Sequence, residues 1–434
     1  MKQLSVIIIG AGGRGRTYSH FMNEMPDKYK IVGVAEPNDV KRKMTQENFS
    51  IPEENCYESW EDILARPKFA DVAIIATMDN MHYAPAMKAI ELGYNLLLEK
   101  PVAPTAEECA DIANAAEKAG VSAIVCHVLR YTPFYKKVKS IVDSGMIGEI
   151  MSIDHTEAIG DVHYSHSFVR GNWHCEAETT PLLLAKSCHD LDIIQWLIGK
   201  KCKKVTSFGS LSYFKADNAP EGAPVRCVDG TCPIKDSCRY NCRNVYLDPE
   251  NHNIPIVWKQ IYRNIVSQGH RYNDEELEEA LRTTDYGLCV FHANNDMLDH
   301  QVVSMEFEDK VTATLTVNAF NDGGRYTRIY GTKGELYAFM SDKDIVVHTF
   351  ADKKKHIIPV ETTEESIAGG HGGGDSGIVY DLYDYFNGTY NGCSVADIRT
   401  SVSNHLIGFA AEEARHSDTV VSVDKFNEKY DFKA

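Results

Sequence analysis

The first 36 residues constrain the fold more than any other stretch of the chain. A run of branched apolar residues, Val6-Ile7-Ile8-Ile9, is typical of a buried parallel strand. It leads into Gly10-Ala11-Gly12-Gly13-Arg14-Gly15, which matches the pattern G-x-G-x-x-G, and apolar residues at helical spacing follow. A strand, a glycine turn and a helix in this order are the context that a dinucleotide fingerprint requires. The sequence therefore predicts a nicotinamide dinucleotide site here.

Each glycine of the fingerprint has a physical role. Gly10 permits the tight turn, Gly12 lets the backbone approach a pyrophosphate, and Gly15 lets the helix pack closely on the strand. Gly13 and Arg14 complete the loop, and the helix that follows points free N–H groups at the phosphates. The alternative is an unrelated glycine turn between a strand and a helix.

A carboxylate follows at the expected distance. A second apolar strand, 31–35, ends at Glu36, which is 21 residues after Gly15. A carboxylate at this spacing meets the adenosine ribose hydroxyls and repels a 2′-phosphate, so we expect NAD rather than NADP as the cofactor. Lys41 and Arg42 lie a few residues further on and could soften that preference.

Strand and helix patterns then alternate as far as residue 127. Further strands are predicted over 71–77, 96–98 and 122–126, and helices over 40–49, 60–64, 84–92 and 106–119. This alternation predicts an α/β domain, 1–127, with a doubly wound parallel sheet whose ligands bind at the carboxyl ends of the strands. The candidate cofactor-binding residues at those ends are Thr77, Asp79, His82, Glu99 and Lys100.

The pattern changes beyond residue 127. Helices are predicted over 131–144, 181–198, 378–386 and 401–416, and strands over 150–157, 205–211, 301–307, 311–318, 325–330, 334–339 and 344–350. We therefore expect a second, α+β domain, 128–434, with a largely antiparallel open sheet that binds substrate and carries subunit contacts.

Charge and hydropathy exclude several classes of partner. The formal net charge of −17 argues against nucleic acid and anionic membranes. No apolar run approaches the roughly 20 residues that a membrane helix needs. No basic segment with an apolar stretch and a cleavage site precedes the first strand. We expect a soluble, cytoplasmic protein.

Four motifs together resemble one family. They are the fingerprint, the Glu99-Lys100-Pro101 turn, Thr77 with His82, and the run Ser187-Cys188-His189-Asp190-Leu191-Asp192. Over nearly its whole length the chain is similar to the oxidoreductases named for glucose–fructose oxidoreductase, inositol dehydrogenase and the rhizopine-catabolism proteins (Gfo/Idh/MocA). The resemblance implies NAD-dependent hydride transfer to or from a secondary hydroxyl of a sugar, glycoside or cyclitol. It also implies a homo-oligomer, a dimer or tetramer built on the open face of the second sheet.

Two residues carry the chemistry that the resemblance implies. In this family the Lys-Pro turn presents the lysine, here Lys100, to the nicotinamide and the substrate hydroxyl, and the histidine matching His189 is the usual acid/base. Oxidising an alcohol needs a base and a positive charge near the oxygen, and a histidine titrates near neutrality. The alternatives are a surface lysine in a turn and a hydrogen-bonded histidine at the domain interface.

One departure from the family pattern lies beside this histidine. Family members commonly place an aspartate or asparagine four residues before it, where this chain has Ala185. Lys186 and Asp192 lie three residues on either side of His189, so on a continuous helix all three share one face. Asp192 could then orient the imidazole, and Lys186 could reach the substrate hydroxyl as a third catalytic residue. A different proton relay weakens any transfer of substrate from the inositol dehydrogenases.

A polar loop, 163–174, is rich in histidines and aromatic residues. Hydrogen-bonding groups beside aromatic faces suit a sugar, and a glycine-rich loop at 369–374 has the flexibility of a closing loop. The alternative for the polar loop is a lid or subunit contact, and its histidine spacing does not favour a metal. The candidate substrate-binding residues are Tyr131, His163, His166, Arg170, Trp173 and His371.

Four of the twelve cysteines cluster in a Cys-rich insertion, about 216–255, in which we expect little regular structure. Cys227, Cys232, Cys238 and Cys242 have the spacing C-x4-C-x5-C-x3-C. Tetrahedral thiolate ligation of one zinc ion would order such a segment, although standard zinc knuckles use C-x2-C pairs. Reduced thiols and disulfides are the alternatives, and a cytoplasmic location disfavours disulfides. We predict a structural zinc, remote from the chemistry.

Two other functions fit the same residues. A hydrolase of the same fold would use tightly held NAD to oxidise a sugar hydroxyl transiently, which permits elimination of the glycosidic substituent. A non-enzymatic sensor would bind dinucleotide and sugar without turnover, and the presence of both Lys100 and His189 argues against it.

Overall fold

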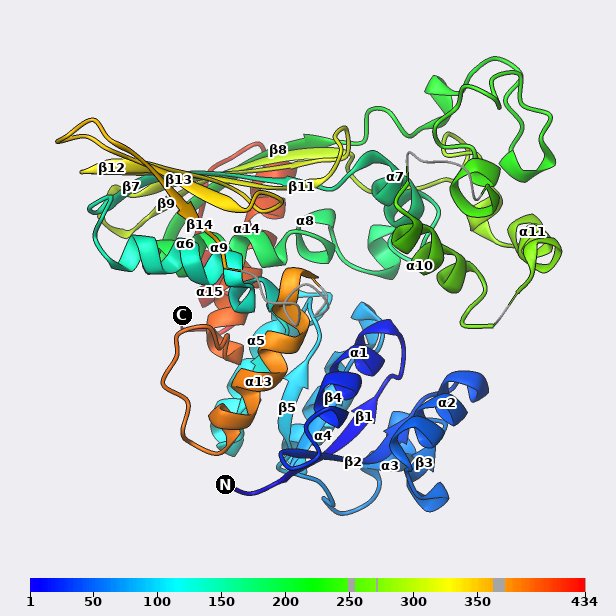
Figure 1. The fold of residues 1–434 in the computed structure, drawn as a ribbon, viewed down its shortest axis with the longest axis horizontal. Coiled ribbons are helices and arrows are strands. Elements are labelled where there is room, and N and C mark those ends of the chain that lie inside the picture. The colour runs from blue at the N-terminus through cyan, green and yellow to red at the C-terminus, as the bar shows by residue number, and fades with distance from the viewer. Residues whose placement is uncertain (249–253, 271, 362–370, 434) are drawn as a thin grey trace.

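The computed structural model describes residues 1–248, 254–270, 272–361 and 371–433. Figure 1 shows two sheets, with helices between them: a parallel sheet in the lower half of the molecule and a larger sheet across the top. A further segment, residues 211–299, leaves the upper sheet and forms a body of short helices and loops at its side, and we call it the excursion.

The lower sheet, sheet A, has six parallel strands in the order β3-β2-β1-β4-β5-β6. The strand order reverses between β1 and β4, and ligands of doubly wound sheets bind at such a switch point. The predicted doubly wound fold is therefore confirmed. The strands are β1 (Leu4–Ile9), β2 (Tyr29–Ala35), β3 (Cys56–Tyr57), β4 (Val72–Ile75), β5 (Asn95–Leu98) and β6 (Ala123–Val125).

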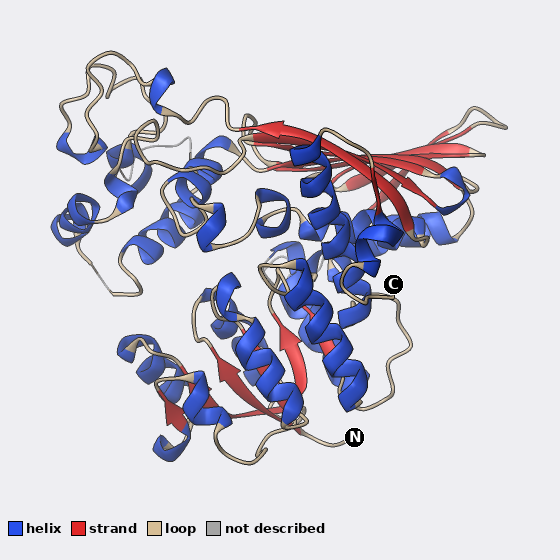
Figure 2. Ribbon diagram, turned by 180° about the vertical axis from the view of Figure 1, so that it is seen from behind, coloured by secondary structure: helices blue, strands red, loops and turns tan. Residues whose placement is uncertain are grey.

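Helices cover both faces of sheet A (Figure 2). They are α1 (Gly13–Asn23), α2 (Asp39–Phe49), α3 (Trp60–Leu64), α4 (Tyr83–Glu91) and α5 (Ala106–Ala119). A helix from the far end of the chain, α13 (Gly374–Phe386), lies beside α1 and shares its apolar core, where Tyr18 and Met22 pack with Ile378 and Leu382. The second half of the chain therefore completes the cover of the first sheet.

The upper sheet, sheet B, has nine strands in the order β14-β13-β12-β11-β7-β10-β9-β8-β15. Only the β7–β10 pair is parallel, as the predicted mixed and largely antiparallel sheet requires. The strands are β7 (Ile150–Ala158), β8 (Cys202–Ser210), β9 (His300–Phe307), β10 (Thr312–Asn318), β11 (Gly324–Gly331), β12 (Gly334–Phe339), β13 (Asp344–Thr349), β14 (Lys355–Pro359) and β15 (Val421–Ser422).

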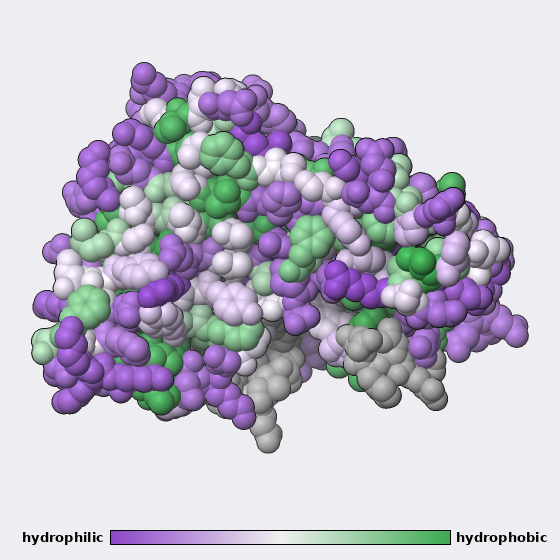
Figure 3. Space-filling model, turned by 90° about the horizontal axis from the view of Figure 1, so that it is seen from above, coloured by the Kyte–Doolittle hydropathy of each residue, from purple (hydrophilic) through white to green (hydrophobic). Residues whose placement is uncertain are grey.

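Helices cover the lower face of sheet B, and its upper face is open. The covering helices include α6 (Pro133–Asp143), α9 (Cys188–Ile198), α14 (Ile398–Ser417) and α15 (Val423–Glu428). Along β11, Thr327 and Ile329 point into the core, while Tyr326 is 48% exposed on the other side. Seen from above, apolar and polar side chains are interspersed on the surface (Figure 3).

The secondary structure differs from the prediction in two places. The helix predicted over 181–198 is broken into α8 (Leu182–Ala185) and α9, because Ser187 leaves helical geometry, with φ −104° and ψ +10°. The excursion contains two helices that we did not predict, α10 (Ile256–Val266) and α11 (Asp274–Thr283).

The start of α11 carries a signal that could have revealed it. Asn273 and Glu276 form a capping box, and Leu277 and Leu281 follow at helical spacing as its buried residues. Among the described helices, none is long and apolar enough to cross a membrane.

Candidate dinucleotide and active site

The glycine loop after β1 is packed on one side and open on the other. Gly10 has φ +89°, and a Cβ there would lie 2.5 Å from the carbonyl oxygen of Ala76. A Cβ on Gly15 would lie 2.1 Å from the carbonyl oxygen of Gly10. On Gly12 and Gly13, a Cβ would have no heavy atom within 4 Å. Packing therefore requires glycine at positions 10 and 15, and the loop backbone at positions 12 and 13 is left open to a ligand.

The first turn of α1 suits a pyrophosphate. The helix begins at Gly13, and the residue before it, Gly12, has no side chain with which to cap the free N–H groups. No acidic residue occupies the first turn. Unpaired N–H groups and the positive end of the helix dipole together form an anion site. The residues present therefore fit the predicted dinucleotide.

Glu36 joins the end of β2 to the glycine loop. Its buried carboxylate accepts hydrogen bonds from the backbone N–H groups of Ala11 at 2.8 Å and Asn38 at 3.0 Å. Each carboxylate oxygen can accept a further bond, so Glu36 can still receive the ribose hydroxyls. Arg42, which could have softened the preference for NAD, donates to the Glu36 carbonyl oxygen at 2.6 Å and pairs with Asp39.

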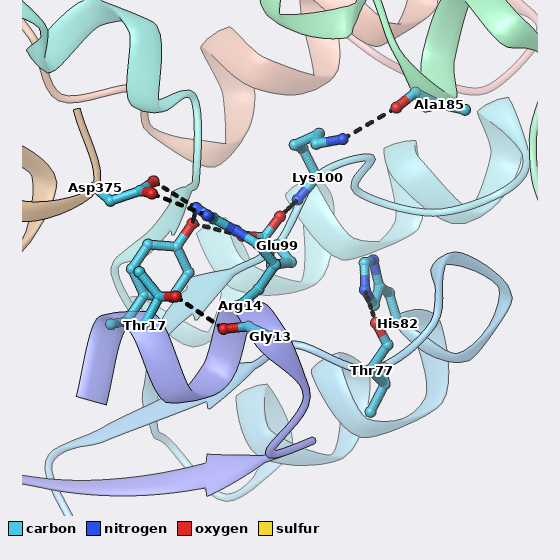
Figure 4. A network of polar contacts seen from close by, with 10 residues as sticks. Gly13, Arg14, Thr17, Thr77, His82, Glu99, Lys100, Ala185 and Asp375 are labelled. Carbon is cyan, nitrogen blue, oxygen red and sulfur yellow. Dashed lines mark hydrogen bonds and ion pairs between the residues drawn. The ribbon is translucent and has the colours of Figure 1, made fainter. Parts of the chain in front are cut away.

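Arg14 makes contacts other than the predicted cofactor contact. Its guanidinium donates to Glu99 at 2.8 Å and to Asp375 of α13 at 2.6 Å, and it also bonds the Tyr18 hydroxyl (Figure 4). Burial alone would raise the pKa of Glu99, but Arg14 and then Lys100 outweigh burial and hold the pKa below its usual value. Glu99 is therefore an ionised anchor for the glycine loop.

The predicted residues after β4 hold neighbouring loops together. Nδ1 of the buried His82 ring lies 2.7 Å from the Pro101 carbonyl oxygen, and Nε2 lies 3.2 Å from that of Thr77 (Figure 4). Asp79 accepts a hydrogen bond of 2.9 Å from the indole of Trp173. Trp173, predicted to bind substrate, therefore ties the polar loop to the strand end that carries Asp79.

Lys100 reaches from sheet A to the break between α8 and α9. It precedes a cis peptide bond to Pro101, and its Nζ donates to the Ala185 carbonyl oxygen at 3.0 Å (Figure 4). Lys186 follows Ala185, and its Nζ lies 3.3 Å from Glu157 of β7. The two predicted catalytic lysines therefore lie on either side of one interdomain contact.

The surroundings of Lys186 suit proton transfer. Burial lowers the pKa of its ammonium, and the nearby charges of Arg325 and Lys100 lower it further. Glu157 acts in the opposite direction without restoring the usual pKa. A lysine with a lowered pKa can exchange a proton closer to neutral pH than a surface lysine.

His189 lies near the start of α9 and is 6% exposed. Its ring meets the edge of the His127 ring, with 5.6 Å between centroids. Asp192 does not orient the His189 ring in the way that we predicted. Both carboxylate oxygens of Asp192 accept bonds of 2.6 Å from Arg130, and one also accepts a 2.6 Å bond from Asn404.

A buried ionic network beside Lys186 was missed in the sequence. Arg325 of β11 pairs with Glu157 at 2.6 Å and with Asp190 at 2.7 Å, and Asp190 lies 2.9 Å from His155 Nε2. Arg325 and His155 hold the pKa of Asp190 at about 2 against the effect of burial. The signal was present in β7, where His155 and Glu157 alternate with exposed positions and so point into the core.

The polar loop turns mainly towards the excursion. His166 Nδ1 lies 2.9 Å from the Tyr246 hydroxyl, and its ring packs against Tyr262. Arg170 donates to the carbonyl oxygens of Leu288 and Tyr240, and the ring of His163 packs near that of Trp258. These contacts give no support to the predicted substrate contacts of the loop, because the excursion supplies its partners.

The two other predicted substrate residues differ in what the structure describes. Tyr131 is 2% exposed and packs closely on Gly377 of α13. His371 begins a short turn, His371–Gly373, but its side chain lies outside the described residues, as do residues 369 and 370 of the predicted glycine-rich loop.

The structure does not support the zinc prediction. No group of three or more histidine, cysteine, aspartate or glutamate residues has a metal-binding arrangement in the described part of the chain, which includes all four clustered cysteines. Cys242 instead belongs to an apolar core with Val245, Leu277 and Leu281. Packing against the unpredicted helix α11 therefore orders a segment that we expected a metal to order.

Comparison with known proteins agrees with this geometry. The model of an oxidoreductase family with an NAD-binding Rossmann fold matches residues 4–127, and the model of its C-terminal α/β domain matches residues 139–392. YteT of Bacillus subtilis (strain 168), an oxidoreductase by name, is 24% identical over 401 residues, which are 87% of this chain and 88% of the relative.

Two further proteins have more specific names. The 2,7-anhydro-N-acetylneuraminate hydratase of Escherichia coli (strain K12) is 30% identical over 202 residues, which are 46% of this chain and 51% of the relative. This match spans about half of that protein. A solved structure of levoglucosan dehydrogenase with NADH and L-sorbose aligns with a TM-score of 0.69 at 18% identity, over 98% of this chain and 99% of that one.

The two family models together cover most of the sequence, in the order in which sheets A and B occur. The chain therefore belongs to the NAD-binding oxidoreductase family of glucose–fructose oxidoreductase, inositol dehydrogenase and the rhizopine-catabolism proteins, as its motifs predicted.

Proposed function

We propose that this protein transfers a hydride between NAD and a secondary hydroxyl of a sugar, glycoside or cyclitol. The observation that carries the proposal is the convergence of Lys100, Lys186 and His189 at the α8–α9 break, next to the carboxyl end of β5. The alignment with levoglucosan dehydrogenase, whose structure holds NADH and a sugar, supports this class of substrate.

The roles follow from charge and position. NAD, when bound, supplies the hydride acceptor. Lys100 places its ammonium where a substrate oxygen would become alkoxide-like, and a fixed positive charge there stabilises that oxygen. We assign the hydroxyl proton to His189 or Lys186, because imidazole is the usual general base in enzymes and because burial lowers the pKa of the Lys186 ammonium. Glu157 and Arg325 position Lys186 and set its pKa.

A second candidate function is a reaction in which NAD is reduced and reoxidised within one turnover. The name of one relative, a hydratase, describes a reaction without net redox change, and this favours the second candidate function. An elimination needs a base for a C–H proton and an acid for the leaving group, and Lys186 with His189 would supply both. Turnover without net NADH absorbance, with NAD retained through purification, would identify this function. A sensor without turnover would leave the lowered pKa of Lys186 without a use.

The first prediction concerns catalysis. Lys100→Met and His189→Ala should each keep most of the NAD affinity, measured by calorimetric titration, because the glycine loop and Glu36 supply the expected contacts to the pyrophosphate and the ribose. Turnover with a sugar substrate should fall by about 10²–10⁴-fold in each variant. Lys88→Met, which changes an exposed lysine paired with Glu91 on α4, is the matched control. Near-normal turnover of His189→Ala would remove that residue from the mechanism.

The second prediction uses Glu157 to test the role of Lys186. Glu157 raises the pKa of Lys186 more than Asp190 does, so Glu157→Gln should lower that pKa further. If neutral Lys186 is the base, the acidic limb of the kcat/KM profile should move to lower pH, and Lys186→Met should lack that limb. Glu335→Gln, at a surface ion pair with Arg328, should leave the profile in place. An unmoved acidic limb in Glu157→Gln would contradict the role of Lys186 as the base.

The third prediction concerns the choice of cofactor. Wild-type protein should bind NAD more tightly than NADP, because the Glu36 carboxylate would face a 2′-phosphate. Glu36→Ala should gain affinity for NADP relative to NAD, measured by titration with both nucleotides. Glu47→Ala removes an exposed carboxylate from the last turn of α2 and should leave the ratio close to that of wild type. A wild-type protein that strongly prefers NADP would refute the assignment.

The fourth prediction concerns assembly. We propose a homo-oligomer, a dimer or tetramer, that buries the open face of sheet B, where Tyr326 is 48% exposed. Light scattering at micromolar concentration should give a multiple of the chain mass, and Tyr326→Lys should lower it. Tyr380→Lys, at a residue of α13 that is 41% exposed, should not. A monomeric wild-type mass would count against this surface. The cytoplasmic location stays a prediction from the sequence.

A further inference from the structure

A group of thiols in the excursion lies around Arg170, a buried arginine of the polar loop. Cys227, Cys232 and Cys238 line a small cavity of about 20 Å³ together with Arg170 and Cys289. Cys289 lies outside the clustered motif, and a β-bridge between Arg226 and Leu288 brings it to the cavity. The volume suits about one water-sized group, so the cavity has no room for an organic substrate.

The charge of Arg170 is unusual because no carboxylate in the described part of the chain pairs with it. The residue is 2% exposed, and its Nε and Nη2 donate to the carbonyl oxygens of Leu288 and Tyr240 at 2.7 and 2.8 Å. Nη1 is buried and has no hydrogen-bond partner in the described part of the chain, and no described carboxylate lies within 4.0 Å of this guanidinium. A buried cation is costly unless an anion accompanies it.

Cys227 lines the same cavity as Arg170 and can carry the balancing negative charge. Its sulfur accepts a hydrogen bond from the Cys242 backbone N–H at 3.3 Å, and in its thiol form it donates to Asn241 Oδ1 at 3.7 Å. A bond from the Cys242 thiol lowers the pKa of Cys227 to about 6, and the charges of Arg170 and Arg243 assist against the effect of burial. The same bond and burial raise the pKa of Cys242, which is 0% exposed and stays a thiol.

We propose that Cys227 and Cys242 are a reversible dithiol–disulfide pair, with Cys227 as the reactive thiolate and Arg170 as its counter-ion. This site is independent of NAD and of the proposed oxidoreductase function. The partly exposed Cys227 meets the oxidant first, and the buried Cys242 resolves the product. Burial raises the pKa of Cys238 and Cys289, so these neighbours remain thiols.

The reaction balances with a hydroperoxide as oxidant. The Cys227 thiolate attacks one oxygen of hydrogen peroxide, an S–O bond forms, the O–O bond breaks, and the departing hydroxide takes a proton to become water. The Cys242 sulfur then attacks the sulfenic acid, an S–S bond forms, and the S–O bond breaks. The second hydroxide leaves as water with the Cys242 proton. Two electrons from the two sulfurs reduce one peroxide to two waters.

The test measures thiol reactivity in the full chain, purified under reducing conditions. Iodoacetamide labelling followed by peptide mass spectrometry should show that Cys227 reacts with an apparent pKa of about 6. At pH 7 such a thiol has about thirtyfold more thiolate than one of pKa 8.5. The exposed Cys393 is the internal reference. One equivalent of peroxide should link the peptides of Cys227 and Cys242, and dithiothreitol should release them.

Variants separate the proposal from a general reactivity of the excursion. Arg170→Met should move Cys227 labelling to higher pH, whereas Arg239→Met, at an exposed arginine paired with Asp161, should not. If Arg170→Met does not fold, Cys242→Ser is decisive, because peroxide should then stop at a Cys227 sulfenic acid that dimedone traps. Labelling of Cys227 no faster than Cys393, or a disulfide without Cys227, would overturn the proposal. One equivalent of tightly bound metal per chain would overturn it too.

Discussion

A buried carboxylate at the end of β5 holds the nucleotide loop and the predicted catalytic lysine in one arrangement. Glu99 accepts from Arg14 at 2.8 Å, from the Tyr18 hydroxyl at 2.5 Å and from the Lys100 backbone N–H at 3.0 Å. Because Arg14 also reaches Asp375, the same anchor extends to α13 from the other end of the chain. Loss of its charge would loosen all three segments, since the half-buried Arg14 guanidinium would keep only Asp375 as a carboxylate partner.

Buried ion pairs also connect the elements around sheet B. Glu157 and Asp190 flank Arg325, and Asp192 faces Arg130 in a separate pair. Buried pairs of this kind add little net stability compared with apolar packing, but their geometry is strict. They fix β7, β11 and α9 relative to one another, and Lys186 lies where those elements meet.

Sequence reasoning succeeded where the determinants are local. The turn at Gly10, the position of Glu36 and the strand that ends at Glu99 each follow from a sequence pattern within a short stretch of the chain. It failed where the contacts join residues that are distant in the sequence. A continuous pattern of apolar residues predicted one helix across the break at Lys186. No pattern near His166 or Arg170 indicates a contact with Tyr246 or Leu288. The same is true of Cys289, whose distance along the chain concealed its place beside the other thiols.

The departure at Ala185 can be understood from the break in the helix. The polar side chain that the family commonly carries at this position is absent, but the Ala185 carbonyl oxygen, left by the end of α8, accepts the Lys100 ammonium at 3.0 Å. A backbone carbonyl can hold a lysine but cannot donate or take a proton. In the mechanism that we propose, the proton-transfer role passes to a neighbouring side chain that can exchange a proton. Lys186 is the next residue, and its lowered pKa and its contact with Glu157 suit it to that role.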